Sequence, residues 1–490
     1  MRRHARTLVY LSCSMLVLAA CGDEGGAGEG TPTSETSTTL PSTDAATASD
    51  SNSDSNQTDT NSGDGDGDAT SAPPDTDTDT NSGDGDGDTT TEPTDSATDT
   101  NSGDGDGDDD PIKFDMEEIP DAGAQGCGGG GEGGEVEFSY IWVANSNQGT
   151  LSKINTQTLE EEARYITRPD GSGRPSRTSV NLSGDVAVAG RDGGVSKFFV
   201  RIEDCVEQNG MPEIQTSTGK DDVLAWDVEE CRAWHRPFPG LSSRPVAWTA
   251  GTFNQGTCVW EAQKVWTQTA APGQAGSMEI HRLNGETGEV EDTVPAPNVS
   301  LGSWGAYGGA VDGEDNFWFS THGSGSPPTL SRVDAETLEL STWPVPNGLS
   351  PYGMTVDSEG HAWVAGYAGG TARFSPDSET WDVVNVLGLG MQADGEGRVW
   401  VANYNPSPGT TAIDVNTLEI LDFIAIPNGG ITKGVSIDFE GYVWLVNMAN
   451  SAYRVDPDTH MFESYDGLDG AYTYSDMTGA GLRNVAFPEG

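Results

Sequence analysis

From about residue 135 onward, short apolar runs alternate with turn-forming residues, and one arrangement of hydrophobic and polar positions returns repeatedly. In this arrangement an Asp stands six residues before a Trp, with a Gly between them. It occurs as Asp312/Trp318, Asp357/Trp363, Asp394/Trp400 and Asp438/Trp444. Asp and Gly favour turns, and an apolar run around a Trp is typical of a buried strand. Each unit is therefore predicted to contain a tight turn followed by a buried strand.

A second pattern follows each of these strands, with Asn or Asp three residues before Thr. Its six occurrences are Asn155/Thr158, Asn284/Thr287, Asp334/Thr337, Asp377/Thr380, Asp414/Thr417 and Asp456/Thr459. Because Asn and Asp side chains bond to their own backbone and tighten turns, this pattern predicts a second hairpin in each unit.

The spacing of the units predicts the fold. With the Trp position as origin, the units are centred on Trp142, Ala187, Trp260, Trp318, Trp363, Trp400 and Trp444. Four short strands in units of about 40 to 45 residues are typical of a β-propeller. We predict an all-β fold of seven four-stranded blades. Six or eight blades are the alternatives, because the units around Ala187 and Trp260 diverge from the others.

The two ends of the repeat region suggest how the ring closes. The first unit has no inner strand, since a glycine-rich stretch, 128–134, precedes it, and the segment 478–487 is left over after the last unit. We expect this C-terminal segment to pair as the innermost strand of the first blade. Such closure protects the strand edges that an open sheet would expose.

The N-terminus has the marks of an export signal. Arg2, Arg3 and Arg6 precede an apolar run, 8–18, of about ten residues, too short to span a bilayer. The ending Leu-Ala-Ala-Cys21 resembles the bacterial lipobox, which implies an acylated Cys21 and stable membrane attachment. Gly22, rather than Asp, favours the outer membrane. We expect a signal peptide over 1–20 and an outer-membrane lipoprotein of the cell envelope, exposed to the periplasm or at the cell surface.

Residues 21–121 are acidic and repetitive, with T-N-S-G-D-G-D-G-D at 60–68, 80–88 and 100–108. Such a segment buries too little apolar surface to fold, so we expect a disordered tether before a propeller domain over 122–490. Weak calcium binding by the Asp-Gly runs and an O-glycosylated stalk are the alternatives. The net charge of −54 excludes nucleic acid as a partner, because nucleic-acid binding requires basic patches.

Four cysteines remain after processing, namely Cys127, Cys205, Cys231 and Cys258, and an exported protein can pair them in three ways. We favour Cys205 with Cys231, because these two bracket an insertion around 200–240. The segment 207–214 within it resembles a degenerate EF-hand loop, which makes Glu207 and Asn209 weak candidates for a metal site. No cofactor is assigned; calcium or magnesium are the ions that the chain could take.

The repeat over 135–490 resembles the virginiamycin B lyase (streptogramin lyase) family and its NHL-like propeller relatives, most clearly in the segments 350–357 and 361–364. That resemblance implies an elimination assisted by Mg²⁺, with a histidine in the middle of a Pro-His-Gly triplet on an inner strand. Here Tyr352 occupies that position, and Tyr307, Leu389 and Lys433 occupy the matching positions of other blades. The general base of the family is thus missing, and we assign no catalytic residue.

Propellers commonly bind ligands at one mouth of their central channel. The repeat alignment places twelve candidate binding residues on that rim: Asn145, Arg177, Trp304, Tyr307, His322, Tyr352, Asn403, Tyr404, Lys433, Asn447, Asp476 and Arg483. Aromatic and amide groups suit carbohydrate or peptide, although the same residues could simply solvate the rim. We expect a surface-anchored propeller that binds a protein, peptide or glycan there. The alternatives are a metal-dependent carbon-oxygen lyase or lactonase, and a structural envelope protein.

Overall fold

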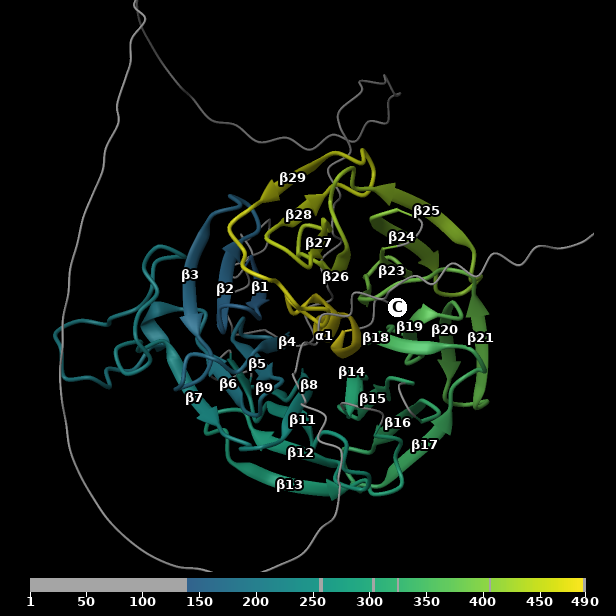
Figure 1. The fold of residues 1–490 in the computed structure, drawn as a ribbon, viewed down its shortest axis with the longest axis horizontal. Coiled ribbons are helices and arrows are strands. Elements are labelled where there is room, and N and C mark those ends of the chain that lie inside the picture. The colour runs from purple at the N-terminus through teal and green to yellow at the C-terminus, as the bar shows by residue number, and fades with distance from the viewer. Residues whose placement is uncertain (1–138, 255–258, 302–304, 324–325, 405–406, 488–490) are drawn as a thin grey trace, which may run out of the picture. The chain divides into compact units, whose positions relative to one another are not determined.

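The computed structural model describes residues 139–254, 259–301, 305–323, 326–404 and 407–487, which form a ring of seven antiparallel β-sheets around a central channel (Figure 1). The fold is all-β, as the repeat predicts. The expected signal peptide and tether, with Cys21, Cys127, Cys258 and Trp304, lie outside the described residues. Among the described residues, no helix has the length and apolar character needed to cross a membrane.

The strands of each blade follow one another from the channel outward. Blade 1 comprises β1 (Tyr140–Asn145), β2 (Thr150–Asn155) and β3 (Glu161–Ile166). Blade 2 comprises β4 (Pro175–Val180), β5 (Val186–Gly190), β6 (Val195–Phe198) and β7 (Arg232–Arg236). Blade 3 comprises β8 (Ser242–Trp248), β11 (Lys264–Ala270), β12 (Glu279–Asn284) and β13 (Val290–Pro295). Blades 4 and 5 comprise β14 (Ala306–Val311), β15 (Phe317–Thr321), β16 (Thr329–Val333) and β17 (Leu340–Pro344); and β18 (Ser350–Val356), β19 (Ala362–Ala368), β20 (Thr371–Ser375) and β21 (Thr380–Val384). Blades 6 and 7 comprise β22 (Met391–Ala393), β23 (Arg398–Asn403), β24 (Gly409–Asp414) and β25 (Ile420–Ala425); and β26 (Thr432–Ile437), β27 (Val443–Asn447), β28 (Ala452–Val455) and β29 (Phe462–Tyr465).

The spacing of six residues between Asp and Trp has a direct structural cause. In blade 5, one carboxylate oxygen of Asp357 accepts the backbone N–H groups of the turn, and the other accepts the indole N–H of Trp363 at 2.7 Å. Asp394 and Trp400 make the same bond at 2.8 Å, and the Asp/Trp pairs of blades 4 and 7 repeat it. One side chain thus closes the turn and satisfies the polar atom of a fully buried Trp, which would otherwise be costly to bury.

The inner strands pack closely against one another around the channel. A Cβ atom on Gly353 would lie 2.5 Å from the carbonyl oxygen of Leu389, and one on Gly434 would lie 2.5 Å from that of Thr473. The Gly353 N–H donates to the Leu389 carbonyl at 2.8 Å. A glycine is therefore required where adjacent blades meet, and side chains of neighbouring positions fill the channel.

The ring closes through the C-terminal segment, but earlier in the chain than the sequence indicates. Residues 470–477 run along the inner edge of β1, with hydrogen bonds between Tyr472 N–H and Ala144 C=O and between Trp142 N–H and Met477 C=O. The expected closing strand, 478–487, is largely α1 (Ala480–Ala486), which lies over the centre of the ring (Figure 1). The prediction of an extended strand over 478–487 was therefore wrong, because three small residues, Gly479, Ala480 and Gly481, turn the chain across the channel.

Blade 3 is centred on Trp266 and not on Trp260. Trp266 pairs with Ala247 on the inner strand and with Arg282 on the next strand outward, the register that Trp318 has in blade 4. Trp260 instead belongs to a hairpin of β9 (Thr252–Asn254) and β10 (Val259–Glu261), inserted between β8 and β11. The prediction that this unit is centred on Trp260 was therefore wrong, because the inserted hairpin contains a Trp of its own.

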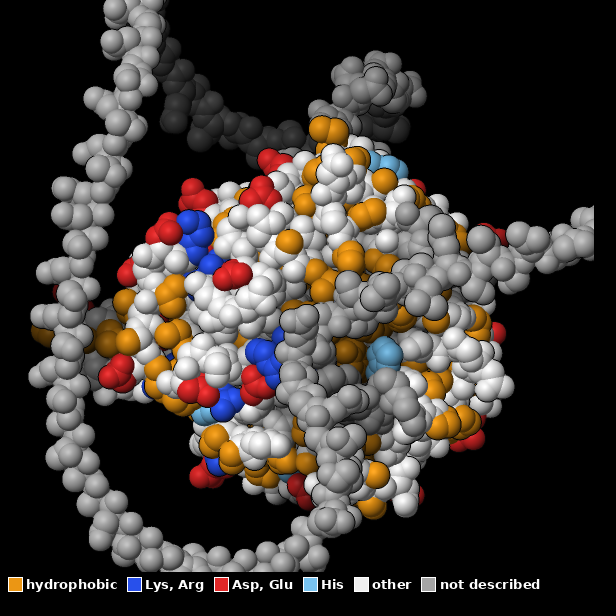
Figure 2. All heavy atoms as spheres, viewed as in Figure 1, with side chains coloured by type: hydrophobic (Ala, Val, Ile, Leu, Met, Phe, Trp, Pro, Cys, Tyr) orange, Lys and Arg blue, Asp and Glu red, His pale blue; other side chains and the backbone are white. Residues whose placement is uncertain are grey.

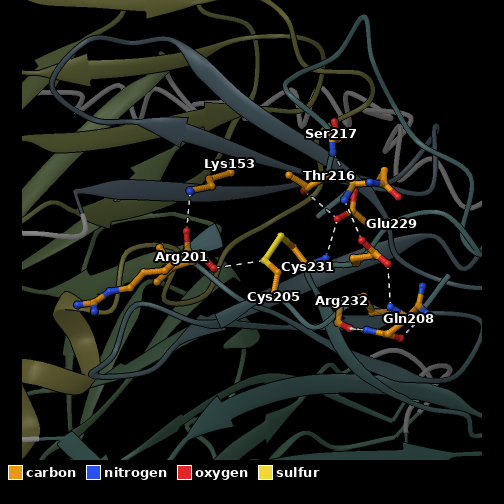
Figure 3. Close-up of a disulfide and its surroundings, with 12 residues drawn as sticks. Lys153, Arg201, Cys205, Gln208, Thr216, Ser217, Glu229, Cys231 and Arg232 are labelled. Atoms are coloured by element: carbon orange, nitrogen blue, oxygen red, sulfur yellow. Dashed lines mark hydrogen bonds between the residues drawn. A yellow bond between two sulfur atoms is a disulfide. The ribbon is translucent and has the colours of Figure 1, made fainter. Parts of the chain in front are cut away.

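A second insertion, between β6 and β7, is held by a disulfide between Cys205 and Cys231 (Figure 3). It contains the short 3-10 helix η1 (Ile202–Asp204). The carboxylate of Glu229 accepts bonds from Thr216, Ser217 and Cys231. The oxygens of the metal candidates Glu207 and Asn209 likewise accept N–H groups of their own loop. Carboxylates and amides therefore organise this loop through its backbone.

Candidate ligand site at the channel mouth

One end of the channel gathers most of the aromatic and basic side chains that line it. We define the channel mouth as the residues Arg177, Arg244, Tyr307, Tyr352, Leu389, Lys433, Tyr472 and Tyr474. Six of them come from near the beginning of the inner strands of blades 2 to 7, and the two last tyrosines come from the closing segment. Residues far apart in the sequence are thus brought together by ring closure.

The tyrosines form one connected network. The hydroxyl of Tyr472 lies 2.7 Å from that of Tyr352 and 3.5 Å from that of Tyr307. The rings of Tyr352 and Tyr474 are 4.8 Å apart between centroids, and those of Tyr307 and Tyr352 are 5.0 Å apart. Aromatic contacts of this kind hold rings in fixed positions. Tyr472 alone among the four is partly exposed, so it faces any ligand that enters the mouth.

Three buried cations surround these rings. The Arg177 guanidinium carbon lies 3.1 Å from the ring centroid of Tyr474, and that of Arg244 lies 4.9 Å from the ring of Tyr307. The Lys433 ammonium is 3.7 Å from the ring centroid of Tyr472. Aromatic faces attract cations, and this attraction offsets part of the free-energy cost of burying these charges. Arg177 and Arg244 are 0 % and 1 % exposed, and Lys433 is 5 % exposed.

The cations change the acidity of Tyr472. Burial acts to raise the pKa of its hydroxyl, but the positive charges of Lys433, Arg244 and Arg177 outweigh burial and lower the pKa to about 7. Burial raises the pKa of the neighbouring Tyr352 hydroxyl, which remains protonated and can donate to Tyr472. The mouth can therefore hold a phenolate near neutral pH.

Arg177 and Tyr474 each carry a buried donor that no described residue satisfies. Arg177 donates through Nε to the Tyr307 carbonyl and through Nη1 to the Ser176 carbonyl, but its Nη2 has no hydrogen-bond partner there. The hydroxyl of Tyr474 also has none. A buried polar group without a partner costs roughly 1–3 kcal/mol, so an acceptor that enters the mouth would gain by bonding these donors.

His322 borders the same cluster. Its ring lies 5.0 Å from that of Tyr307 and 6.1 Å from that of Tyr352. Burial and the charge of Arg244 lower the pKa of the imidazole, so it is neutral at pH 7. Over the described part of the chain, no group of three or more His, Cys, Asp or Glu side chains is arranged to hold a metal ion.

The structure brings together only part of the rim expected from the sequence. Arg177, Tyr307, His322, Tyr352 and Lys433 lie at the mouth, and Tyr404 stacks on Tyr367 beside it. Three further residues are tied to nearby loops by hydrogen bonds of their amide groups, which makes them supports of the rim: Asn145, Asn403 and Asn447. Trp304 lies outside the described residues.

Asp476 and Arg483, which the sequence places on the same rim, lie at the opposite end of the channel. The Asp476 carboxylate accepts the N–H groups of Gly479 and Leu482 near α1. Arg483 belongs to α1 and stacks over Phe439, in a turn at this end. The sequence placed these two residues wrongly because the segment that closes the ring is 470–477 and not 478–487. Its end, and the α1 helix that follows, therefore lie at the end of the channel opposite the mouth.

Arg244, Tyr472 and Tyr474 were missed by the sequence analysis. Arg244 occupies, in Ser243-Arg244-Pro245, the place that Tyr307 and Tyr352 occupy in their blades, but centring blade 3 on Trp260 hid this match. The alternating Tyr472-Thr-Tyr474 is a strand signal that could have placed the closing segment correctly.

No protein-family model matches the chain, and no curated protein matches it. Among solved structures, the chain is similar to virginiamycin B lyase from Staphylococcus aureus at 15 % identity and a TM-score of 0.42, covering 61 % of this chain and 87 % of the lyase. A protein from Lactobacillus plantarum shares 12 % identity at a TM-score of 0.46, covering 68 % and 98 % of the two chains. BamB from Moraxella catarrhalis shares 11 % identity at a TM-score of 0.39, and the similarity covers 69 % of this chain and 85 % of BamB. These similarities concern the fold, so a function has to be argued from the residues of the channel mouth.

Proposed function

We propose that the chain is a surface-anchored lipoprotein whose propeller binds a protein, peptide or glycan ligand at the channel mouth. The observation that carries this proposal is the unpartnered Nη2 of Arg177, fully buried among tyrosine rings and other cations. A fold that only needed rigidity would fill this space with apolar side chains, because buried charges without good partners are costly. A ligand supplies the missing acceptors.

The test is the binding of the full-length chain to arrays of peptides and glycans, compared with two tyrosine variants. Tyr404→Ala removes a partly buried ring beside the mouth, and Tyr442→Ala removes a partly buried ring in the turn before β27, where it lies under Arg454. We expect Tyr404→Ala to weaken capture of the ligand and Tyr442→Ala to leave it unchanged. Equal loss in both variants, or no binding to either array, would contradict a site at the mouth.

The anchoring part of the proposal rests on the lipobox-like Leu-Ala-Ala-Cys21 and on the acidic segment that follows it. We expect the chain to fractionate with membranes and to incorporate labelled fatty acid in its natural host. Cys21→Ser should release it into the soluble fraction, whereas Cys13→Ser, which changes a cysteine of the expected signal peptide, should not. Release by both substitutions, or by neither, would contradict acylation at Cys21.

A further inference from the structure

The outermost strand of blade 6, β25, differs from the outermost strands of the other blades. Three of its six residues are large apolar side chains exposed to solvent, namely Ile420, Leu421 and Phe423, at 53 %, 50 % and 41 % exposure. The corresponding strands β13, β21 and β29 have one such residue each, and β3, β7 and β17 have none. Because contiguous exposed apolar surface marks interaction sites, β25 is the outer strand most suited to a partner.

The backbone of β25 is available on one side. Its inner edge pairs with β24, and no strand that the structure describes pairs with its outer edge, which lies on the rim of the ring (Figure 1). Edge strands are usually guarded by lysine, proline or another charged side chain. The one charged residue of β25 is Asp422, whose carboxylate lies 2.6 Å from Nε2 of His460, between β28 and β29 of blade 7. The outer row of N–H and C=O groups is therefore open to an added strand.

The charge around this edge is negative. The stretch 399–432 contains Asp414, Glu419 and Asp422 and no Lys or Arg. The Lys and Arg side chains visible in Figure 2 lie on the side of blades 1 to 3, and none is visible over blade 6. An apolar strand among carboxylates is complementary to a segment that is apolar and basic.

A comparison with blade 5 shows how blade 6 acquires this charge. In blade 5, Arg373 pairs with Asp382 of β21 and donates to its carboxylate at 2.9 Å. The same position on the third strand of blade 6 holds Ala412, which pairs with Asp422 of β25. The third strand of blade 6 thus offers no arginine to the carboxylate of its outer strand.

A second copy of the chain is a poor occupant of this edge. Pairing of β25 with β25 of another copy would bring the same carboxylates together, and the chain has a net charge of −54. Like charges across an interface oppose association. The edge therefore favours a partner of opposite charge.

We infer that the outer edge of β25 binds an extended segment of a partner protein in which apolar residues alternate with lysine or arginine. The segment adds a fifth strand to blade 6 through backbone hydrogen bonds. Asp422 and Phe423 are successive residues of the strand and point to opposite faces. A paired strand therefore meets a carboxylate on one face and an aromatic ring on the other, which calls for alternation in the partner. This site is separate from the channel mouth and does not depend on the function proposed above.

The experiment is a calorimetric titration of the full-length chain with three short peptides of equal length. The first alternates valine and lysine, the second alternates valine and glutamate, and the third is the first with methylated backbone nitrogens. We expect the first to bind. Each of the others should bind at least about tenfold more weakly, because one has the wrong charge and the other cannot donate backbone hydrogen bonds.

Two substitutions at matched positions locate the contact. Phe423 of β25 and Val383 of β21 are both exposed, and each follows the Asp that is paired with the third strand. Phe423→Lys should weaken binding of the valine–lysine peptide by about tenfold or more, because it removes apolar surface and adds a like charge. Val383→Lys should change the affinity by less than about twofold. Tyr404→Ala, beside the mouth, should bind this peptide as the natural chain does.

Four results would overturn the inference. The first is equal binding of the lysine and glutamate peptides, and the second is equal binding of the methylated peptide. The third is a dimer of the free chain, detected by light scattering, that Phe423→Lys dissociates, because a second copy would then occupy the edge. The fourth is binding that Tyr404→Ala abolishes and Phe423→Lys leaves intact, which would support the function proposed for the mouth instead.

Discussion

The two ends of the central channel are built from the same inner strands and yet differ in almost every physical property. At the α1 end, Leu482 of the helix and apolar residues of β8 and β18 line a small cavity of ≈ 30 Å³. Asp476, the carboxylate of that end, accepts several N–H groups. At the mouth, cations and tyrosines are buried with donors left over. The α1 end also has a buried donor without a partner among the described residues, the indole N–H of Trp248. The two ends therefore differ mainly in their charged groups, a carboxylate at the α1 end and cations at the mouth.

The largest effect that this comparison predicts is on stability at the α1 end. Asp476→Ala leaves the N–H groups of Gly479 and Leu482, and the amide of Gln392, without their acceptor. We expect a loss of about 2–4 kcal/mol in the free energy of unfolding, measured by denaturant titration. Capture of a ligand on the peptide and glycan arrays should be unchanged where the variant is folded. A loss below about 0.5 kcal/mol would mean that Asp476 does not hold this end closed.

The next effect is on binding, through the charge of Tyr472. Its pKa is lowered to about 7, so the hydroxyl becomes a phenolate as the pH rises and can no longer donate a hydrogen bond to a ligand. Capture of a ligand that accepts this bond should weaken as the pH rises through about 7. The groups facing Tyr472 are Lys433, Arg177, Arg191 and Arg244, with the hydroxyls of Tyr307 and Tyr352. Binding by Tyr472→Phe should depend little on pH in this range. If the variant showed the same pH dependence as the natural chain, a group other than Tyr472 would cause it.

The same group has a smaller effect on stability. A folded-state pKa below the ordinary value of about 10 means that the ionised form stabilises the fold. This contribution is fully present above pH 10 and is lost as the pH falls through about 7. Relative to Tyr472→Phe, the natural chain should gain about 2–3 kcal/mol of unfolding free energy between pH 6 and pH 9. A gain at acid pH instead would mean that the cations of the mouth do not control this tyrosine.

The smallest effect concerns Tyr474, whose hydroxyl has no hydrogen-bond partner among the described residues. Tyr474→Phe removes an unsatisfied polar atom and keeps the ring that packs on Arg177. We expect the unfolding free energy to stay within about 0.5 kcal/mol of the natural chain or to rise. A loss of 2 kcal/mol or more, in the same denaturant titration, would show that the hydroxyl has a structural partner and is not reserved for a ligand.

The blades could be predicted from the sequence because their signals are local. Asp357 and Trp363 lie in one hairpin, and a carboxylate that bonds both the turn and the indole enforces their spacing. The same reasoning failed for blade 3, where the hairpin containing Trp260 interrupts the unit. It also misplaced the closing strand, because pairing of residues 470–477 with β1 depends on contacts more than 300 residues apart in sequence.

The site was predicted only where a blade kept its repeat intact. Tyr307, Tyr352 and Lys433 could be found by alignment, since each precedes the glycine at which inner strands touch. Arg244 lies in the interrupted blade, and Tyr472 lies in the closing segment. No local pattern reports that these residues meet, because their proximity is a property of the closed ring.

The central claim is that the cations of the channel mouth control the ionisation of Tyr472. The direct measurement is a spectroscopic titration of tyrosine ionisation in the full-length chain and in Tyr472→Phe. The account predicts that one of the twelve tyrosines ionises near pH 7. This step should be absent in Tyr472→Phe. If every tyrosine ionised at or above its ordinary pKa of about 10, the cations of the mouth would not control Tyr472.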